Sequence, residues 1–376
     1  MLRTPLLSVF VALSSLAVRV AAQPQSPQPG EVSKAAATPI DPAEAPTEPL
    51  GPSLEGYDYP FPVKTHTVAV QGQALSMAYM DVPPAEGKGS GRIVVLLHGK
   101  NFFGAYWERT AKDLSAAGYR VVIPDQIGFG KSSKPEDVQY TLHMLAQNTA
   151  SLLDSLHATK VDVVGHSTGG MIAARFALMF PDRVSSLTLV NPIGLEDYRL
   201  KVPYLDVAGW YEREVKQTYA SLAKYQRDTY YAGSWSAEYA KWVKPIAAMT
   251  LGPGWPRVAR VSALTYDMIY TQPVCYELGQ IKAPTLLIIG QRDRSAIGKD
   301  RAAPEVAKTM GDFAALGKWA AKTIPSARLV ELDNVGHMPM TEAYDRFIGP
   351  LKEFLGAQPA VPAPATLVEP PDGAVK

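Results

Sequence analysis

Short, unbroken apolar runs recur along the middle of the chain and alternate with longer amphipathic stretches. The apolar runs read RIVVLLHG, YRVVIPD, VDVVGH, VSSLTLVNP, PTLLIIG and ARLVELD. Runs of Val, Ile and Leu without polar alternation are typical of strands buried on both faces of a parallel sheet. Helical patterns lie between most of them, over 106–117, 141–156, 169–179 and 344–355. This order predicts an α/β fold with an open, mostly parallel sheet.

Two regions depart from this rhythm. The stretch KTHTVAVQGQALSMAYMDV alternates apolar and polar residues on both sides of Gln71-Gly72-Gln73, which predicts a β-hairpin. Residues 195–280 contain no strand of the main pattern and are rich in Trp and Tyr. We therefore expect a core formed by 56–194 and 281–357, with 195–280 inserted as a helical cap over the site.

The two ends of the chain have a different composition. Residues 1–22 are typical of a signal peptide, with Arg3, an apolar run too short to span a bilayer, and small residues before the expected cleavage site. An uncleaved anchor is the alternative, because Arg19 interrupts this segment. Residues 23–55 and 358–376 are rich in Pro and Ala, a composition that predicts a disordered linker and a disordered tail. We expect a secreted or periplasmic protein without a stable membrane span after processing.

Composition and charge limit the classes of binding partner that the sequence favours. Hydrophobic residues make up 47% of the 376 residues, which suits a globular body. There are 37 Lys and Arg against 36 Asp and Glu, a formal charge of +1, and no basic stripe favours nucleic acid. Cys275 is the sole cysteine, so no intrachain disulfide can form. The sequence thus favours a small-molecule ligand and indicates no particular oligomeric state.

The stretch VDVVGHSTGG places Ser167 just past a buried strand, where a helix begins. Gly165 and Gly169 flank the serine, as a sharp strand-to-helix turn requires, and such a turn exposes a reactive hydroxyl. The alternative is a serine that only caps the helix in a glycine-rich turn. The strand before it and the helix after it favour a nucleophile.

A nucleophilic serine needs a base and an acid that orients the base. Of the six histidines, His337 follows the last strand and should lie at the same sheet edge as Ser167. Asp293 lies three residues past the strand-ending Gly290, and the order Ser, Asp, His is the one expected on such a sheet. Other candidates for the acid are Glu196, Asp197 and Asp300.

A tetrahedral intermediate also needs two backbone N–H groups that face the developing oxyanion. The first is the amide of Thr168, directly after the serine. The second is expected in the turn after the strand that ends at His98-Gly99, from the amide of Lys100.

Together these segments resemble the α/β-hydrolase superfamily over 57–356. The resemblance rests on LLHGKNFFGAYW, VVIPDQIGFGKSS, VVGHSTGG, LLIIGQRDR and DNVGHMP, in the order of the family. It implies Ser167 as nucleophile, Asp293 as acid, His337 as base, and Lys100 and Thr168 as oxyanion donors. It also implies a structural role for the loop 125–133 and requires no metal or cofactor.

Two departures from the family bear on specificity. Lys100-Asn101 follows His98-Gly99, in place of the residues found there in related esterases and epoxide hydrolases, and Thr168 replaces a common methionine. A serine in place of an aspartate nucleophile argues against dehalogenase and epoxide-hydrolase chemistry.

We therefore expect a serine hydrolase that cleaves carboxylic esters of small to medium apolar or aromatic compounds through an acyl-enzyme. Phe102, Trp235 and Trp242 are the candidates for substrate contact, although aromatic residues of the cap can also fill its own core. The alternatives are C–C bond or amide hydrolysis by the same residues. A protein of another class, a non-catalytic ligand-binding protein of the same fold, is the further alternative.

Overall fold

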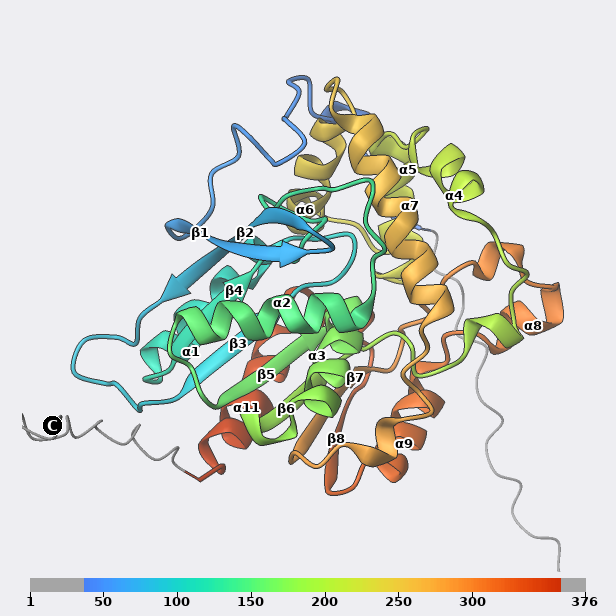
Figure 1. Ribbon diagram of the computed structural model, residues 1–376. Helices are drawn as coiled ribbons and strands as arrows, with labels where there is room; N and C mark the ends of the chain where they lie inside the picture. The colour runs from blue at the N-terminus through green and yellow to red at the C-terminus, as the bar shows by residue number, and fades with distance from the viewer. Residues whose placement is uncertain (1–36, 360–376) are drawn as a thin grey trace, which may run out of the picture. The chain divides into compact units, whose positions relative to one another are not determined.

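A computed structural model describes residues 37–359 and contains the predicted α/β sheet (Figure 1). The segments expected as signal peptide (1–22), as first part of the linker (23–36) and as most of the tail (360–376) lie outside the described residues. The eight-stranded sheet has the order β1-β2-β4-β3-β5-β6-β7-β8. β1 and β2 form the expected antiparallel hairpin, β2 runs antiparallel to β4, and the remaining neighbours are parallel.

Because β3 to β8 are parallel, their carboxyl ends meet at one edge of the sheet, which is where ligands bind in open α/β folds. The strands are β1 (Val63–Val70), β2 (Gln73–Val82), β3 (Ile93–Leu97), β4 (Arg120–Pro124), β5 (Val161–His166), β6 (Val184–Val190), β7 (Thr285–Gly290) and β8 (Ala327–Leu332).

Helices cover both faces of the sheet (Figure 1). Successive residues of β3 point to opposite faces. Val95 and Leu97 pack in the cluster that includes α2, α3 and α9, while Val94 and Leu96 pack in the cluster that includes α1 and α11. The helices of the core are α1 (Glu108–Ala116), α2 (Leu142–Ser155), α3 (Thr168–Met179), α8 (Pro304–Thr309), α9 (Phe313–Thr323), α10 (Pro339–Glu342) and α11 (Tyr344–Gly356).

The segment 195–280 is helical and contains no strand. Its four α-helices gather beyond the upper end of the sheet in Figure 1. They are α4 (Val207–Glu214), α5 (Tyr219–Thr229), α6 (Ala237–Met249) and α7 (Trp255–Thr271). Contacts of α4 with α7 and of α5 with α6 hold them together.

The prediction of a disordered linker over 23–55 is wrong for its second part, because residues 37–55 lie against the cap. The amide of Thr38 donates to Gly233 O at 2.9 Å, and the amide of Leu50 donates to Ala248 O at 3.1 Å. Leu54 is fully buried. Composition alone was misleading, since a segment too poor in apolar residues for its own core can still insert a few of them into another.

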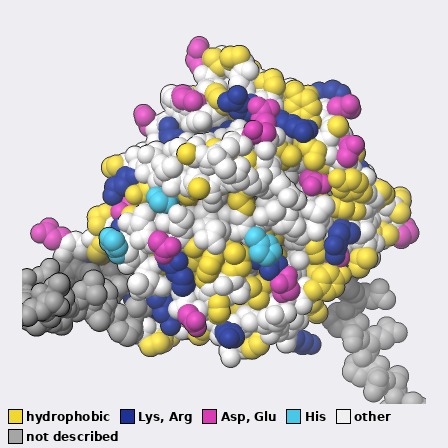
Figure 2. Space-filling model, viewed as in Figure 1, with side chains coloured by type: hydrophobic (Ala, Val, Ile, Leu, Met, Phe, Trp, Pro, Cys, Tyr) yellow, Lys and Arg dark blue, Asp and Glu magenta, His cyan; other side chains and the backbone are white. Residues whose placement is uncertain are grey.

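The surface of the described residues carries no large single-sign patch on the face in Figure 2, where Lys and Arg are interspersed with Asp and Glu. None of the described helices is long and apolar enough to cross a membrane.

Candidate functional site

Ser167 occupies the sharp turn between β5 and α3, with φ 56° and ψ −120°. This is a strained conformation for a residue with a side chain, and such strain is typical of functional turns. A Cβ on Gly165 would lie 2.3 Å from Gly169 O, and a Cβ on Gly169 would lie 2.3 Å from Leu97 O. The two glycines are therefore required because backbone passes directly against each of them.

His337 and Asp293 form a buried pair at the same edge. Asp293 Oδ2 accepts from His337 Nδ1 at 2.6 Å and from Asn191 Nδ2 at 2.7 Å, while Oδ1 accepts from the amide of Ser295 at 2.8 Å. Since a carboxylate only accepts, Nδ1 of His337 carries the proton and Nε2 is left as a base. Nε2 is buried and has no hydrogen-bond partner among the described residues.

The other candidates for the acid have partners elsewhere. Glu196 binds Lys201 and the amide of Gly311. Asp197 binds Arg199 and Tyr276, and Asp300 binds Arg213. Their carboxylates do not contact His337 within the part of the chain that the structure describes.

A small cavity of about 30 Å³, called here the inner cavity, brings the predicted residues together. Ser167 and His337 both line it, although no hydrogen bond joins them in this structure. Lys100 and Thr168 line it as well, and Asp293 lies behind His337.

The two amides expected to face an oxyanion are available. Neither the N–H of Lys100 nor that of Thr168 donates to an acceptor within residues 37–359. The turn that carries Lys100 lies against the serine, since a Cβ added to Gly99 would be 3.1 Å from Ser167 Cβ. Two free amides beside one hydroxyl can stabilise negative charge that develops there.

His166, next to the serine in sequence, connects the two loops of the site. Its Nε2 donates to the carbonyl of His337 at 2.9 Å, so its Nδ1 accepts from the hydroxyl of Tyr106 at 3.1 Å. The oxygen of Tyr106 accepts in turn from the amide of Gly99 at 3.2 Å. Burial holds the pKa of His166 well below its ordinary value, so this histidine is a neutral connector.

Two further residues hold the loop of His337. The carboxylate of Glu342 accepts from the amides of Gly336 and Met338, on either side of the histidine, and burial raises its pKa. The carbonyl of Tyr230 accepts from the amide of His337 at 2.9 Å, and the two rings stack with centres 4.5 Å apart.

The sequence reasoning missed these supports. Asn191 directly follows β6 at the same edge of the sheet, and this position was a usable signal. Glu342 lies five residues after His337 at the end of α10, so its contact with this loop is local. Tyr230 carries no local signal, because only the fold brings the end of α5 to His337.

The loop 125–133 has the structural role that the resemblance implied. Asp125 accepts from the amides of Gly104 and Lys131 at 2.7 and 2.8 Å, and from the hydroxyl of Tyr59 at 2.7 Å. This buried carboxylate thereby ties the turn after β4 to the turn after β3.

The three aromatic residues expected to contact substrate are packed in the core instead. Phe102 lies against Tyr106 and Tyr230, and Trp235 against Tyr231. Trp242 is buried in the same cluster, and none of the three lines the inner cavity. The physical reason is that the cap needs its largest side chains to hold four short helices on the sheet.

Tyrosine residues of the cap line the inner cavity, where Phe102, Trp235 and Trp242 were expected. Tyr225, Tyr230 and Tyr266 line the inner cavity together with Ile193 and Ile297. A second cavity of about 600 Å³, called here the outer cavity, continues from it towards α4 and α5. Both cavities are lined by Asn101, Tyr225, Tyr266, Ala296 and Ile297.

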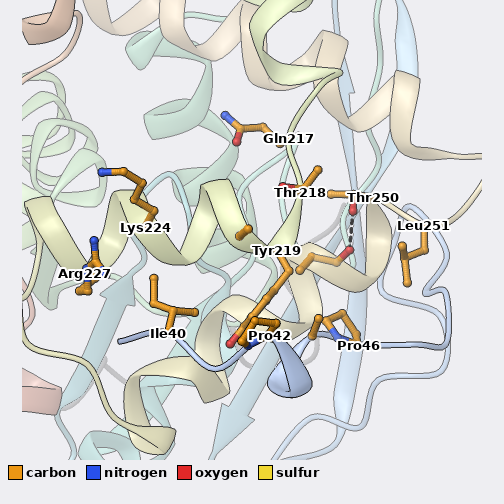
Figure 3. A pocket seen from close by; sticks show the side chains of 13 residues that line it. Ile40, Pro42, Pro46, Gln217, Thr218, Tyr219, Lys224, Arg227, Thr250 and Leu251 are labelled. Carbon is orange, nitrogen blue, oxygen red and sulfur yellow. Dashed lines mark hydrogen bonds between the residues drawn. The ribbon is translucent and has the colours of Figure 1, made fainter. Parts of the chain in front are cut away.

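A third cavity, of about 640 Å³, lies away from this site, between the segment 37–55 and the cap (Figure 3). Figure 3 labels the lining residues Ile40, Pro42 and Pro46 of the segment and Tyr219 and Leu251 of the cap. It shares no lining residue with the inner cavity. Within residues 37–359 no group of three His, Cys, Asp or Glu side chains could hold a metal ion.

Comparisons with known proteins agree with this arrangement. Residues 92–344 match the model of the alpha/beta hydrolase fold family. A crystal structure of "a probable hydrolytic enzyme" from Pseudomonas aeruginosa is 49% identical, with a TM-score of 0.80, and the match covers 83% of this chain and 99% of that one.

Curated relatives are more distant. Lipase 1 of Psychrobacter immobilis is 26% identical over 75% of this chain and 83% of its own length. The 2-hydroxy-6-oxo-2,4-heptadienoate hydrolase of Pseudomonas putida is 36% identical over 28% of this chain, which spans 40% of that enzyme. From the sheet, the turn around Ser167 and the family match, the chain belongs to the alpha/beta hydrolase fold family and is a hydrolase.

Proposed function

We propose that the protein is a serine hydrolase that cleaves carboxylic esters of small to medium compounds through an acyl-enzyme. The observation that carries this proposal is the buried His337 Nε2, which has no partner in the described residues and lines one small cavity with Ser167. A buried nitrogen without a hydrogen-bond partner lowers the stability of the folded protein, so its presence is typical of a group that accepts a proton during the reaction.

In the first half of the reaction, Ser167 Oγ attacks the carbonyl carbon of the ester while His337 Nε2 takes the hydroxyl proton. The amides of Lys100 and Thr168 donate to the oxyanion of the tetrahedral intermediate. Collapse of the intermediate breaks the bond to the alcohol oxygen, which takes the proton from Nε2, and leaves the acyl group on Ser167.

In the second half, His337 Nε2 takes a proton from water, and the hydroxide attacks the acyl carbon. The same amides stabilise the second oxyanion. The proton then returns from Nε2 to Ser167 Oγ as the acid leaves. Asp293 orients the imidazole and stabilises the imidazolium that forms twice.

A fluorophosphonate probe tests the nucleophile directly. We expect covalent labelling at Ser167 in the wild type and none in Ser167→Ala, with the ester turnover of the variant reduced to background. Ser155→Ala, at an exposed serine that ends α2, is the matched control and should label like the wild type. Absence of label from a folded wild type, or label on another serine, would contradict the proposal.

Two other reactions use the same residues. The proposed nucleophile, base and oxyanion amides would also serve C–C bond hydrolysis and amide hydrolysis, and the partly matching relative from Pseudomonas putida is named as a hydrolase of a heptadienoate. The match to a lipase, over 75% of this chain and 83% of that enzyme, favours esters. A panel of alkyl esters, aryl esters and aminoacyl amides separates these reactions, and exclusive turnover of amides would contradict ester specificity.

We also propose that the protein is secreted or periplasmic, on the composition of residues 1–22. N-terminal sequencing of exported material tests this. A mature start near Gln23 supports cleavage, and a start at Met1 contradicts it.

A further inference from the structure

Lys100 lines the inner cavity and is half-buried. Its Nζ donates to Ser262 Oγ at 2.5 Å and lies 3.5 Å from the centre of the Tyr266 ring. The hydroxyl of Ser262 donates in turn to Glu214 Oε2 at 2.5 Å. Lys100 therefore reaches a carboxylate only through an intervening hydroxyl.

The charge of Lys100 is not balanced inside this cavity. Among the described residues, no Asp or Glu lines the inner cavity, and Lys100 is the one Lys or Arg that does. Burial lowers the pKa of Lys100 to about 8, while the nearby Glu214 opposes this shift. An ammonium removed from water without a direct anionic partner is costly, so an anion that enters the cavity would be stabilised.

Three buried polar atoms of the same cavity also have no partner in residues 37–359. They are Thr168 Oγ1, Ser295 Oγ and His337 Nε2. The side chains of Thr168 and Ser295 are 2% and 4% exposed. Because buried polar groups are nearly always hydrogen-bonded, a cavity with this many unused groups suits a polar ligand better than an apolar one.

We infer that the enzyme selects esters that also carry a carboxylate within a few bonds of the scissile carbonyl, and that Lys100 binds this carboxylate. The inference rests on the ester hydrolysis proposed above and names its substrate class. A lysine ammonium has three N–H donors. Ser262 accepts from one, and the ring of Tyr266 lies beside the amine, which leaves a donor for the ligand.

The position of Lys100 in the chain strengthens this inference. Its backbone amide is one of the two proposed oxyanion donors, and Lys100 lines the cavity that contains Ser167. One residue therefore contacts both the reacting carbonyl and the second anionic group, which restricts the spacing between them. A neutral apolar ester would leave one N–H of the amine and the hydroxyls of Thr168 and Ser295 without partners, at a cost in free energy.

The experiment compares anionic esters with neutral esters of matched shape in the full-length protein. Monoethyl succinate, glutarate and adipate are paired with ethyl butanoate, pentanoate and hexanoate, in which a methyl group replaces the carboxylate. O-acetylglycolate is paired with ethyl acetate, so that the carboxylate is placed on the alcohol side. Charge-assisted hydrogen bonds predict a kcat/KM at least about tenfold higher for the anionic ester in one or more pairs.

Variants identify the group responsible. Lys100→Met retains the backbone amide and should lower the anionic-to-neutral ratio of kcat/KM to about one, while Lys100→Arg should retain a preference. Glu214→Gln retains an acceptor for Ser262 and removes the competing carboxylate, so the ratio should rise. Lys112→Met, on an exposed lysine of α1, is the matched control and should leave the ratio unchanged.

The outcomes separate this inference from the proposed function. A wild-type ratio of one or less in every pair, with Ser167 still labelled by the fluorophosphonate, overturns the role of Lys100 and leaves the ester hydrolase standing. A high ratio that Lys100→Met and Glu214→Gln both leave unchanged also overturns it. Loss of labelling together with no turnover of any ester overturns both.

Discussion

The sheet edge and the cap meet at one cavity, but their residues are positioned by different means. At the edge, Ser167 and Asp293 each follow a buried strand, β5 and β7, within a few residues. His337 follows β8, the half-exposed last strand of the sheet, and local turns fix all three. In the cap, Tyr225, Tyr230 and Tyr266 come from α5, its C-terminal end and α7, and only helix packing brings them together. Positions fixed by short turns tolerate little change, whereas positions fixed by packing depend on the stability of the whole cap.

The largest expected effect belongs to the edge. Asp293→Asn retains the fold and loses the charge that orients His337, so kcat for ester hydrolysis should fall by about 10⁴-fold with little change in the free energy of unfolding. Glu196→Gln and Asp197→Asn are the controls and should each retain most of the activity. Near-normal turnover by Asp293→Asn would show that Asp293 is not the acid.

In the cap, by contrast, we expect a large loss of stability with little loss of activity. Trp235 is buried against Tyr231, so Trp235→Ala should lower the free energy of unfolding by about 3–5 kcal/mol. Because Trp235 does not line the inner cavity, kcat/KM at a temperature well below unfolding should stay within a few-fold of wild type. Denaturant unfolding and steady-state kinetics on one preparation check both. A change in ester specificity without loss of stability would place Trp235 in the substrate pocket after all.

The steric restriction at the edge gives a smaller change in stability. Gly169→Ala would place a Cβ 2.3 Å from Leu97 O, and relief of this contact should cost about 1–3 kcal/mol or more. Gly349→Ala is the matched control, since the corresponding Cβ in α11 meets nothing within 4 Å and alanine favours a helix. Chemical denaturation should thus show opposite signs for the two variants, and equal stability of the two would contradict the turn geometry.

The smallest effect tests the ends of the cap helices. Thr218 caps α5 through its side chain, which accepts from the amide of Ser221, and Thr218→Ala should cost about 1 kcal/mol. The ester kinetics should be unaffected at low temperature. A loss of kcat with unchanged stability would mean that the start of α5 is coupled to the site more directly than packing implies.

The same contrast explains what the sequence could predict. Buried apolar runs and the turns after them place Ser167, Asp293, His337 and the two amides, because a strand of a parallel sheet defines where its carboxyl end must be. The hairpin and the helical nature of the cap were also readable from alternation and from the lack of strand patterns.

The lining of the cavity could not be predicted, for a physical reason. The sequence of the cap does not distinguish an aromatic residue that faces a ligand from one that packs against other aromatic residues. In the structure Trp235 and Trp242 are packed in the core, whereas Tyr225 and Tyr266 line the inner cavity. Residues 37–55 were misjudged in the same way, since Leu54 is buried by contacts that lie far away in the sequence.

The hydrogen bond from the amide of His337 to the carbonyl of Tyr230 limits how freely the cap can be exchanged for another. The cap is an insertion in the sequence, yet it supplies one of the supports of the proposed base. A chimaera that replaces 195–280 with the cap of another family member would therefore have to reproduce this single carbonyl as well as a new pocket. Transplanted caps that lack it should give folded proteins with a poorly oriented His337, so in this protein specificity and catalytic power cannot be exchanged independently.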